Sequence, residues 1–319
     1  MKVFIAGATG VLGRRLCREF HARKHTVLGL ARSAKNEATI RELGGECRTA
    51  SLFDADSLAR AAQGADVLVH AATAIPTVIK PAPQDWILND RIRREGTRAL
   101  VEAAKTVGAK MLVIQSITWV ARPTDQSAFD EDSPLNPDAT IQSAADMETI
   151  AREAGERYGL RVAILRCGWF YAADTAHTRV FGQQLLARKF PIIGKGDAIW
   201  SWIHVDDAAT AFVLAAEAGK NGLWHIVDNE PVRSGVYLRA LAERIGAAEP
   251  RHVPVWLARL IAGSFAVKFM ASSTKTSNAR FRQDFDWSPR YPSYHEGLDE
   301  VVAEWRAENF LDLGKRKAA

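Results

Sequence analysis

Residues 2–13 read Lys-Val-Phe-Ile-Ala-Gly-Ala-Thr-Gly-Val-Leu-Gly, and this stretch decides the fold. Val3 to Ala6 is a short apolar run of the kind that fully buried strands show. Three glycines follow at Gly-x-x-Gly-x-x-Gly spacing, and apolar residues then recur at helical spacing, at Leu12, Leu16 and Phe20. The glycines therefore lie on a turn that leads from a strand into a helix.

This turn has the features of a dinucleotide-binding loop. Its first glycine permits a sharp turn, its second lets the backbone approach a pyrophosphate, and its third lets the helix pack close to the strand. The N-terminus of the helix offers unpaired N–H groups and a positive dipole to the phosphates. We expect the cofactor to be bound by Gly7, Thr9, Gly10, Val11, Leu12 and Gly13. The alternative is a tight turn that binds nothing.

Strands and helices alternate through the first half of the chain. Strand-like apolar runs occur at 26–30, 46–50, 66–70, 110–114 and 161–165. Helical patterns separate them, and the longest spans 85–107. This alternation predicts an α/β protein with a doubly wound Rossmann parallel sheet, covered by helices on both faces.

The alternation loosens after residue 165. We expect residues 1–165 to form an NADP-binding Rossmann domain and residues 166–319 to form mainly a smaller C-terminal substrate lobe. Residues 199–227 are expected to pack back on the first domain, and 314–319 to form a basic tail. A ligand should bind in the crevice at the carboxyl ends of the strands.

Two helices of the second half carry specific expectations. Asp206 or Asp207 is predicted to cap a helix at 208–218. The longest apolar stretch, 253–270, contains two charged residues, Arg259 and Lys268. It therefore predicts an amphipathic or partly buried helix and no membrane span.

The composition is typical of an ordinary globular protein. The 319 residues are 47% hydrophobic and 25% charged, and the C-terminal tail supplies three of the net +5 charges. No basic stripe elsewhere supports nucleic-acid binding. The three cysteines are scattered, which predicts a reduced protein with no metal site. The opening strand leaves no room for a signal peptide, so we expect the protein to be cytoplasmic. We expect a small-molecule substrate, no membrane partner, and a monomer or homodimer.

The end of the second strand bears on the choice of cofactor. Arg32 lies 19 residues beyond Gly13, where NAD-binding folds of this type usually carry an acidic residue for the ribose 2′-hydroxyl. An arginine can instead bind a 2′-phosphate through paired hydrogen bonds, and Lys35 and the Ser33 hydroxyl could assist. The sequence thus favours NADP, with NAD less favoured. The alternative is that Arg32 is a solvated residue at a strand end.

Several motifs together resemble the short-chain dehydrogenase/reductase superfamily, in its extended or atypical branch of the NAD(P)-dependent epimerase/dehydratase type. The motifs are Gly7-Ala8-Thr9-Gly10-Val11-Leu12-Gly13, His70-Ala71-Ala72-Thr73, Gly96-Thr97, Trp202-Ile203-His204-Val205-Asp206-Asp207 and Ser277-Asn278-Ala279-Arg280. The likeness covers nearly the whole chain. It implies further cofactor contacts at Leu52, Ala71, Ala72, Thr73, Gln115, Gly168, Trp169 and Phe170.

The chain departs from the family where the chemistry is expected. The superfamily uses a Ser or Thr after the fifth strand and a Tyr-x-x-x-Lys pair on the next helix, in which the Tyr is the general acid and base. Aligned on Met147-Glu148, the Tyr position falls at Thr140 and the Lys position at Ala144. A Tyr-x-x-x-Lys pair occurs nowhere in this chain.

Three other residues are candidates for the chemistry. Gln115 and Ser116 end the fifth strand, where they could hydrogen-bond a substrate, and Tyr171 follows the sixth strand and could donate a proton. Packing is an equally good interpretation of Tyr171. Aromatic residues near the expected crevice favour an apolar or aromatic substrate over a sugar nucleotide; they are Trp200, Trp202, Trp224, Trp256 and Phe265.

These observations favour an NADP-dependent oxidoreductase that transfers hydride to or from a small carbonyl compound, alcohol or activated alkene. One alternative is a nucleotide-sugar epimerase or dehydratase. The other is a non-catalytic NADP(H)-binding sensor, which the missing Tyr and Lys would suit.

Overall fold

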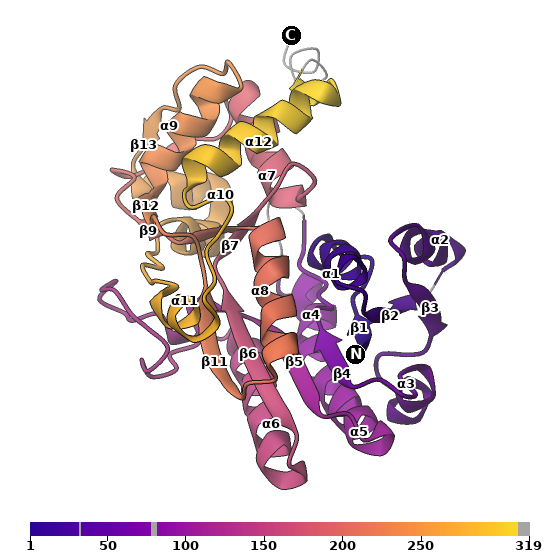
Figure 1. The fold of residues 1–319 in the computed structure, drawn as a ribbon. Coiled ribbons are helices and arrows are strands. Elements are labelled where there is room, and N and C mark those ends of the chain that lie inside the picture. Colours follow the sequence, from indigo (N-terminus) through magenta and orange to yellow (C-terminus); the bar gives the residue numbers. More distant parts are fainter. Residues whose placement is uncertain (32, 78–81, 312–319) are drawn as a thin grey trace.

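The structure, a computed structural model, describes residues 1–31, 33–77 and 82–311 (Figure 1). Within these residues, seven parallel strands form one sheet in the order β11-β6-β5-β4-β1-β2-β3. The strands are β1 (Lys2–Ala6), β2 (Thr26–Ala31), β3 (Glu46–Thr49), β4 (Val67–His70), β5 (Met111–Ile117), β6 (Arg161–Cys167) and β11 (Gly222–Ile226). The strand order reverses between β1 and β4, which is the crevice where doubly wound folds bind dinucleotides. The Rossmann fold predicted from the sequence is confirmed.

Helices cover both faces of this sheet, because its central strands are apolar on both sides. One face packs against α1 (Val11–Ala22), α2 (Ala34–Glu42) and α8 (Val205–Ala218). The opposite face packs against α3 (Ala55–Ala61), α5 (Thr97–Val107) and α6 (Gln142–Tyr158). Each face thus has its own apolar core.

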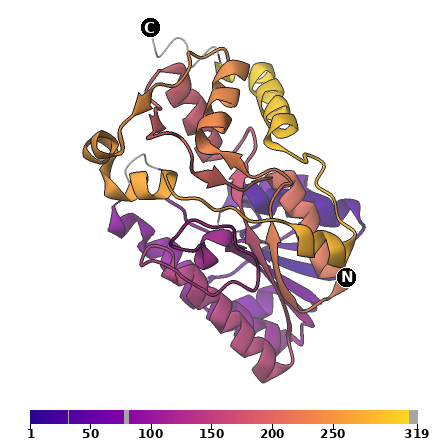
Figure 2. The same cartoon turned by 90° about the vertical axis from the view of Figure 1, so that its left-hand side faces the viewer.

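A second lobe stands over the carboxyl ends of the strands (Figure 2). Its helices are α7 (Ala176–Leu186), α9 (Ser234–Arg244), α10 (Val255–Met270) and α12 (Tyr294–Ala307), whereas α11 (Ala279–Phe285) packs on β11 and α8 beside the main sheet. Its short strands are β7 (Trp169–Tyr171), β8 (Ile192–Ile193), β9 (Ile199–Trp200), β10 (Trp202–His204), β12 (Val232–Arg233) and β13 (His252–Val253). They form three two-stranded sheets. A third core, rich in tryptophan and tyrosine, lies inside this lobe.

The chain returns from the second lobe to the main sheet. The strand β11 pairs with β6, and α8 packs against α1. The division of the chain into domains at residue 165 stays a prediction.

The start of α8 differs from the sequence prediction. The N-cap is His204, whose ring nitrogen accepts the backbone N–H of Asp206. The two predicted caps have other contacts: Asp206 pairs with Arg15, and Asp207 accepts the backbone N–H groups of Arg290 and Tyr291. The prediction was wrong because tertiary contacts engage both carboxylates.

Two expected long helices are interrupted. The segment 85–107 consists of a 3-10 turn (Pro83–Trp86), α4 (Ile87–Arg91), a π-helical turn (Ile92–Gly96) and α5. The helix α10 is broken at Gly263, whose φ of 85° and ψ of 155° are not helical. Only a glycine adopts this backbone conformation without strain. Within the described residues, no helix is both long and apolar enough to cross a membrane.

Candidate functional site

The glycine loop has the geometry that the sequence predicts. Gly7 has a φ of +92°, and a Cβ there would lie 2.6 Å from the backbone of Ala71 and Ala72. A Cβ on Gly13 would lie 1.9 Å from the carbonyl oxygen of Gly7. The backbone N–H of Gly10 donates to that same oxygen at 3.0 Å. The loop is therefore a tight cradle that side chains would fill.

The N-terminus of α1 is open to an anion. Gly10 is the N-cap residue and offers no side chain to the first-turn N–H groups. The first turn of α1 carries no acidic residue that would repel a phosphate. Unpaired amides and the helix dipole together form an anion site, so these residues fit the pyrophosphate of a dinucleotide.

Two arginines join α1 to the second lobe. Arg14 pairs with Asp174 at 2.5 Å, and Arg15 pairs with Asp174 at 3.0 Å and also with Asp206. Burial alone would raise the pKa of Asp174, but the hydrogen bonds and charges of the two arginines hold it below its ordinary value. No sequence pattern indicates this contact, because about 160 residues separate the partners.

Other residues predicted to bind the cofactor occupy varied environments. Leu52 is buried and faces Gly96, where a Cβ would lie 3.1 Å from the Leu52 Cγ. Thr73 is exposed just beyond β4. The Ser33 hydroxyl accepts the backbone N–H of Asn36 and so caps α2. Arg32 lies outside the described residues, and its contact with a 2′-phosphate stays a prediction.

Ser116 lies in a buried polar network at the end of β5. Its hydroxyl donates to the Glu148 carboxylate at 2.6 Å. Arg166, its register neighbour on β6, donates to the two oxygens of Glu148 at 2.8 and 2.7 Å. All three side chains are at most 2% exposed. Gln115 is half-buried and projects to the opposite face of β5.

Tyr171 is fully buried in the second lobe. Its hydroxyl donates to the backbone carbonyl of Ser293 at 3.4 Å, and its ring meets Trp202 and His204 edge-on. Burial raises the pKa of Tyr171 well above its ordinary value. This environment favours the packing interpretation. The catalytic roles of Tyr171, Ser116 and Gln115 stay predictions.

The positions of the usual Tyr and Lys are filled by residues that cannot transfer protons. The Thr140 hydroxyl donates to the Asp138 carboxylate one turn before α6. Ala144 is fully buried and packs with Val120 and Ala145. The structure therefore holds no Tyr–Lys proton relay at this end of α6.

An aromatic cluster lies beside this position. Four tryptophans, which we call the indole cluster, are Trp119, Trp169, Trp200 and Trp202. The ring of Trp169 is central: its centroid lies 5.1, 5.2 and 5.5 Å from the centroids of the other three. Ile117 packs against both this cluster and the Ala144 group. Aromatic side chains thus approach the place where the family keeps its catalytic pair.

The sequence identified only part of this cluster. It named Trp200 and Trp202, which belong to the cluster, but it did not single out Trp119. Trp224 lies elsewhere, packed on Phe281 and Phe285 of α11, and Trp256 is 65% exposed. The side chain of Phe265 lies outside the described part of the chain.

The cofactor contacts predicted after β6 adjoin the indole cluster. A Cβ on Gly168 would lie 2.4 Å from the carbonyl oxygen of Ser201, so the turn after β6 packs closely on the second lobe. Trp169 belongs to the cluster, and Phe170 is half-buried against the core of the α1 face. Their contacts with a cofactor stay predictions.

Asp228 is a buried acidic residue beside the indole cluster that the sequence analysis did not single out. It follows β11 at the carboxyl edge of the sheet, and its backbone N–H donates to the carbonyl of Trp202 at 2.7 Å. Burial raises the pKa of its carboxyl group well above the ordinary value. An acidic residue directly after a predicted strand was a signal that could have identified it.

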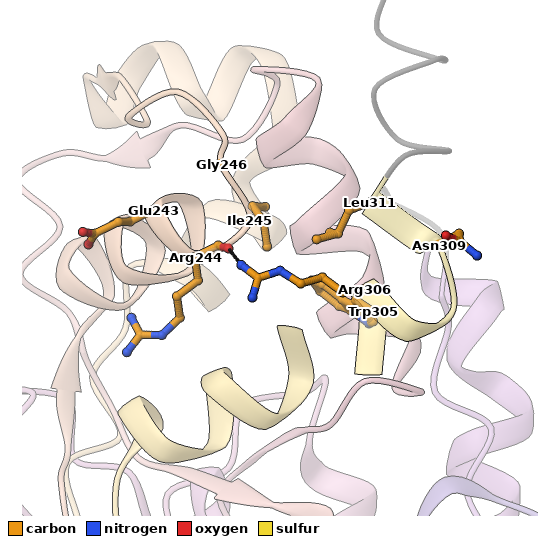
Figure 3. A pocket seen from close by; sticks show the side chains of 8 residues that line it. All are labelled: Glu243, Arg244, Ile245, Gly246, Trp305, Arg306, Asn309 and Leu311. Atoms are coloured by element: carbon orange, nitrogen blue, oxygen red, sulfur yellow. Dashed lines mark hydrogen bonds between the residues drawn. The ribbon is translucent and has the colours of Figure 1, made fainter. Parts of the chain in front are cut away.

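A cavity of about 470 Å³ lies between α9 and α12 (Figure 3). Arg306 crosses it and donates to the backbone carbonyl of Arg244 at 3.1 Å. The cavity includes none of the predicted site residues. Among the described residues, no group of three or more His, Cys, Asp or Glu could hold a metal ion.

Comparisons with known proteins show which proteins this chain resembles. The model of the NAD dependent epimerase/dehydratase family matches residues 3–226. A 3-diazoavenalumate denitrifying reductase of a Streptomyces species is 35% identical over 93% of this chain and 99% of its own length. A 4-hydroxy-2-methyl-3-oxo-4-farnesyl-3,4-dihydroquinoline-1-oxide ketoreductase of Stigmatella aurantiaca is 27% identical over 82% of this chain and 79% of its own.

A solved structure shows the same fold. The human epimerase family protein solved with NADPH superposes with a TM-score of 0.78 at 19% identity, covering 95% of this chain and 99% of its own.

Proposed function

This chain belongs to the NAD-dependent epimerase/dehydratase family, and from that premise we propose that it is an NADPH-dependent reductase of an aromatic small molecule. Its named relatives include reductases, and it is an NAD(P)-dependent oxidoreductase, as the sequence predicted. The proposal adds the choice of NADPH and the type of group that is reduced.

The observation that carries the proposal is the absence of the Tyr–Lys pair. A carbonyl group that receives hydride becomes an alkoxide and needs a proton, which the Tyr normally supplies. Here Thr140 and the buried Ala144 occupy those positions. A suitable acceptor is therefore one that needs no proton from the protein.

An aryl diazonium group is such an acceptor. When it receives hydride, the carbon–nitrogen bond breaks, dinitrogen leaves, and the hydride becomes the new ring hydrogen, so that charge balances without a proton. The relative that is 35% identical is named for denitrifying a diazo compound. We assign the same class of reaction to this chain.

The chain's own residues would hold the cofactor and the substrate. The glycine loop and the open N-terminus of α1 would bind the pyrophosphate. The bound nicotinamide would supply the hydride. The Glu148–Arg166 ion pair fixes the ends of β5 and β6, and the half-buried Gln115 would orient a substrate at the end of β5. The aromatic core beside Ile117 would exclude water from the reaction.

The preference for NADPH rests on Arg32. An Arg32→Ala variant should weaken NADPH binding at least tenfold and NADH binding less than twofold, because only NADPH carries the 2′-phosphate. Titration of both nucleotides by fluorescence measures this difference. Arg60→Ala, which removes an exposed charge at the far end of α3, is the matched control. Equal weakening of both nucleotides by Arg32→Ala would contradict the preference.

The reaction is tested with two acceptors that differ only in the reducible group, 4-carboxybenzenediazonium and 4-carboxybenzaldehyde. We expect enzyme-dependent NADPH oxidation at 340 nm with the diazonium salt, above the rate without protein. Benzoate should form, and deuteride-labelled NADPH should place deuterium on its ring.

Three outcomes would contradict the proposal. They are faster turnover of the aldehyde, tight NADPH binding without turnover of either acceptor, and retention of oxidised cofactor through purification. The second would support the sensor, and the third would support the epimerase or dehydratase.

A further inference from the structure

The buried tryptophans of this chain fall into two groups according to their indole N–H. Three donate a hydrogen bond: Trp224 to Asp284 at 2.7 Å, Trp287 to Thr210 at 3.1 Å and Trp305 to the carbonyl of Ala173 at 2.8 Å. The four members of the indole cluster do not. In the part of the chain that the structure describes, none of their N–H groups has a hydrogen-bond partner.

The unpaired groups therefore lie together in one place. Buried polar groups in folded proteins are nearly always hydrogen-bonded, and a buried donor without an acceptor costs free energy. An indole N–H is a donor only, so none of the four can satisfy another. Four such groups around the central ring of Trp169 indicate that the acceptor comes from outside the chain.

Two further unpaired polar atoms border the cluster. Tyr237 stacks on Trp202 at 4.1 Å between centroids, and its hydroxyl has no partner among the described residues. One carboxyl oxygen of Asp228 also has no hydrogen-bond partner among the described residues, and the backbone N–H of Asp228 donates to the carbonyl of Trp202. Because burial raises the pKa of Asp228, its carboxyl group can keep a proton and act as a donor. Each of these groups is thus a donor that has no acceptor among the described residues.

We propose that the indole cluster binds a planar aromatic molecule that carries carboxylate or phenol oxygens. The indole faces would stack on the ring of the ligand, and the indole N–H groups would donate to its oxygens. The donors are uncharged, which suits a carboxylate or phenol better than a phosphate, for which proteins favour arginine. The inference rests on the proposed function, because it names the substrate class of the same site.

Phe269 is the ring that a ligand would displace. It stacks on Trp119 at 5.8 Å and lies 4.5 Å from Trp169, and it is half-buried, whereas the four tryptophans are at most 7% exposed. It belongs to α10, which is interrupted at Gly263. The half of α10 that carries Phe269 is therefore not continuous with the first half.

The test uses binding and does not depend on turnover. The probes are 4-hydroxycinnamate, which has both kinds of oxygen, and styrene, a similar planar ring without oxygen. Titration calorimetry on the full chain, with and without NADPH, should show 4-hydroxycinnamate binding at least tenfold more tightly than styrene. Equal affinities for the two probes would overturn the proposal even if no variant could be folded.

Variants locate the site. Trp169→Phe and Trp200→Phe each remove one N–H and keep an aromatic ring. Each should weaken 4-hydroxycinnamate about fivefold, the net value of one neutral hydrogen bond, and leave styrene within twofold. Trp287→Phe, which removes a paired N–H outside the cluster, is the control and should change neither affinity. Unchanged affinity for 4-hydroxycinnamate in both cluster variants would overturn the proposal.

The two proposals fail in different ways. If the protein reduces a diazonium salt but the cluster variants bind 4-hydroxycinnamate as tightly as the wild type, only this inference is overturned. Cluster-dependent binding of 4-hydroxycinnamate, without turnover of any acceptor, would overturn the proposed function and leave the binding site in place.

Discussion

Glu148 is the residue on which the end of the sheet depends. It accepts hydrogen bonds from Ser116 and from two nitrogens of Arg166, and it also pairs with Arg152 at 2.7 Å. Its side chain is fully buried. A buried carboxylate is tolerated only when it is paired and hydrogen-bonded, so the network holds β5, β6 and α6 in one arrangement.

Replacing Arg166 with alanine should therefore destabilise the protein by about 3–5 kcal/mol, because Glu148 would remain buried without its main partner. Urea unfolding at pH 7 measures this change. Arg48→Ala breaks an exposed pair with Glu46 and is the control, with an expected loss below about 1 kcal/mol. A loss of that small size in Arg166→Ala would show that the buried pair does not stabilise the sheet.

Thr140 and Ala144 show how far single residues can be interpreted from the sequence. The loss of the Tyr–Lys pair was evident from residue identity alone. The role of Ser116 was not, since its partners Glu148 and Arg166 lie 32 and 50 residues away. Tyr171 illustrates the same limit, because its burial depends on Ser293 and Gly297, which follow more than 100 residues later.

The loop and the helix α1 act as one element. Gly13 is in the first turn of α1, and its missing Cβ allows that turn to rest on the carbonyl of Gly7. The predicted roles of these glycines follow from local geometry, since the contacts span only six residues. This is why the sequence identified the element correctly.

Gly13→Ala should abolish measurable NADPH binding and lower stability by several kcal/mol. Its Cβ would meet backbone atoms, which cannot move aside as a flexible side chain could. Gly108→Ala is the matched control: its φ is +68°, and a Cβ there meets nothing within 4 Å, so only the backbone strain of about 1 kcal/mol remains. Fluorescence titration of NADPH and thermal unfolding follow both variants. Normal NADPH affinity in a folded Gly13→Ala protein would disprove the assigned role of the loop.

At the scale of the whole molecule, charged groups fix the second lobe to α1. Arg15 contacts both Asp174 and Asp206, and the carboxylates of α12 lie close to this contact. Among them, Glu304 has its pKa raised to about 7, first by burial and then by the hydrogen bond and charge of Glu300. The join between the lobes is therefore sensitive to pH near neutrality.

The raised pKa fixes the sign of a pH dependence. Glu304 in the folded protein binds its proton more tightly than in the unfolded chain, so its stabilising contribution is present below about pH 4.5 and is lost as the pH rises through about 7. Glu304→Gln should accordingly be more stable than the wild type at pH 8, by roughly 0.5 kcal/mol. The difference is small because solvent screens the exposed carboxylate. At pH 5 the stability of the variant should be closer to that of the wild type. Urea unfolding at both pH values measures this. The exposed Glu153→Gln is the control, and a Glu304→Gln effect independent of pH would contradict the assignment.

The sequence by itself determined the Rossmann sheet, the glycine loop, the family and the absence of the usual catalytic pair. Each of these depends on residue identity or on spacing within a few turns, which the chain carries locally. The tertiary structure decided what lies in the site. It brought Trp119, Trp169, Trp200 and Trp202 together from β7, β9, β10 and the turn after β5, and it left their N–H groups without partners among residues 1–31, 33–77 and 82–311. It also buried Ser116 and Tyr171 and replaced the expected caps of α8 with His204. Burial and hydrogen bonding depend on partners far away in the chain, and only the packed fold brings those partners together.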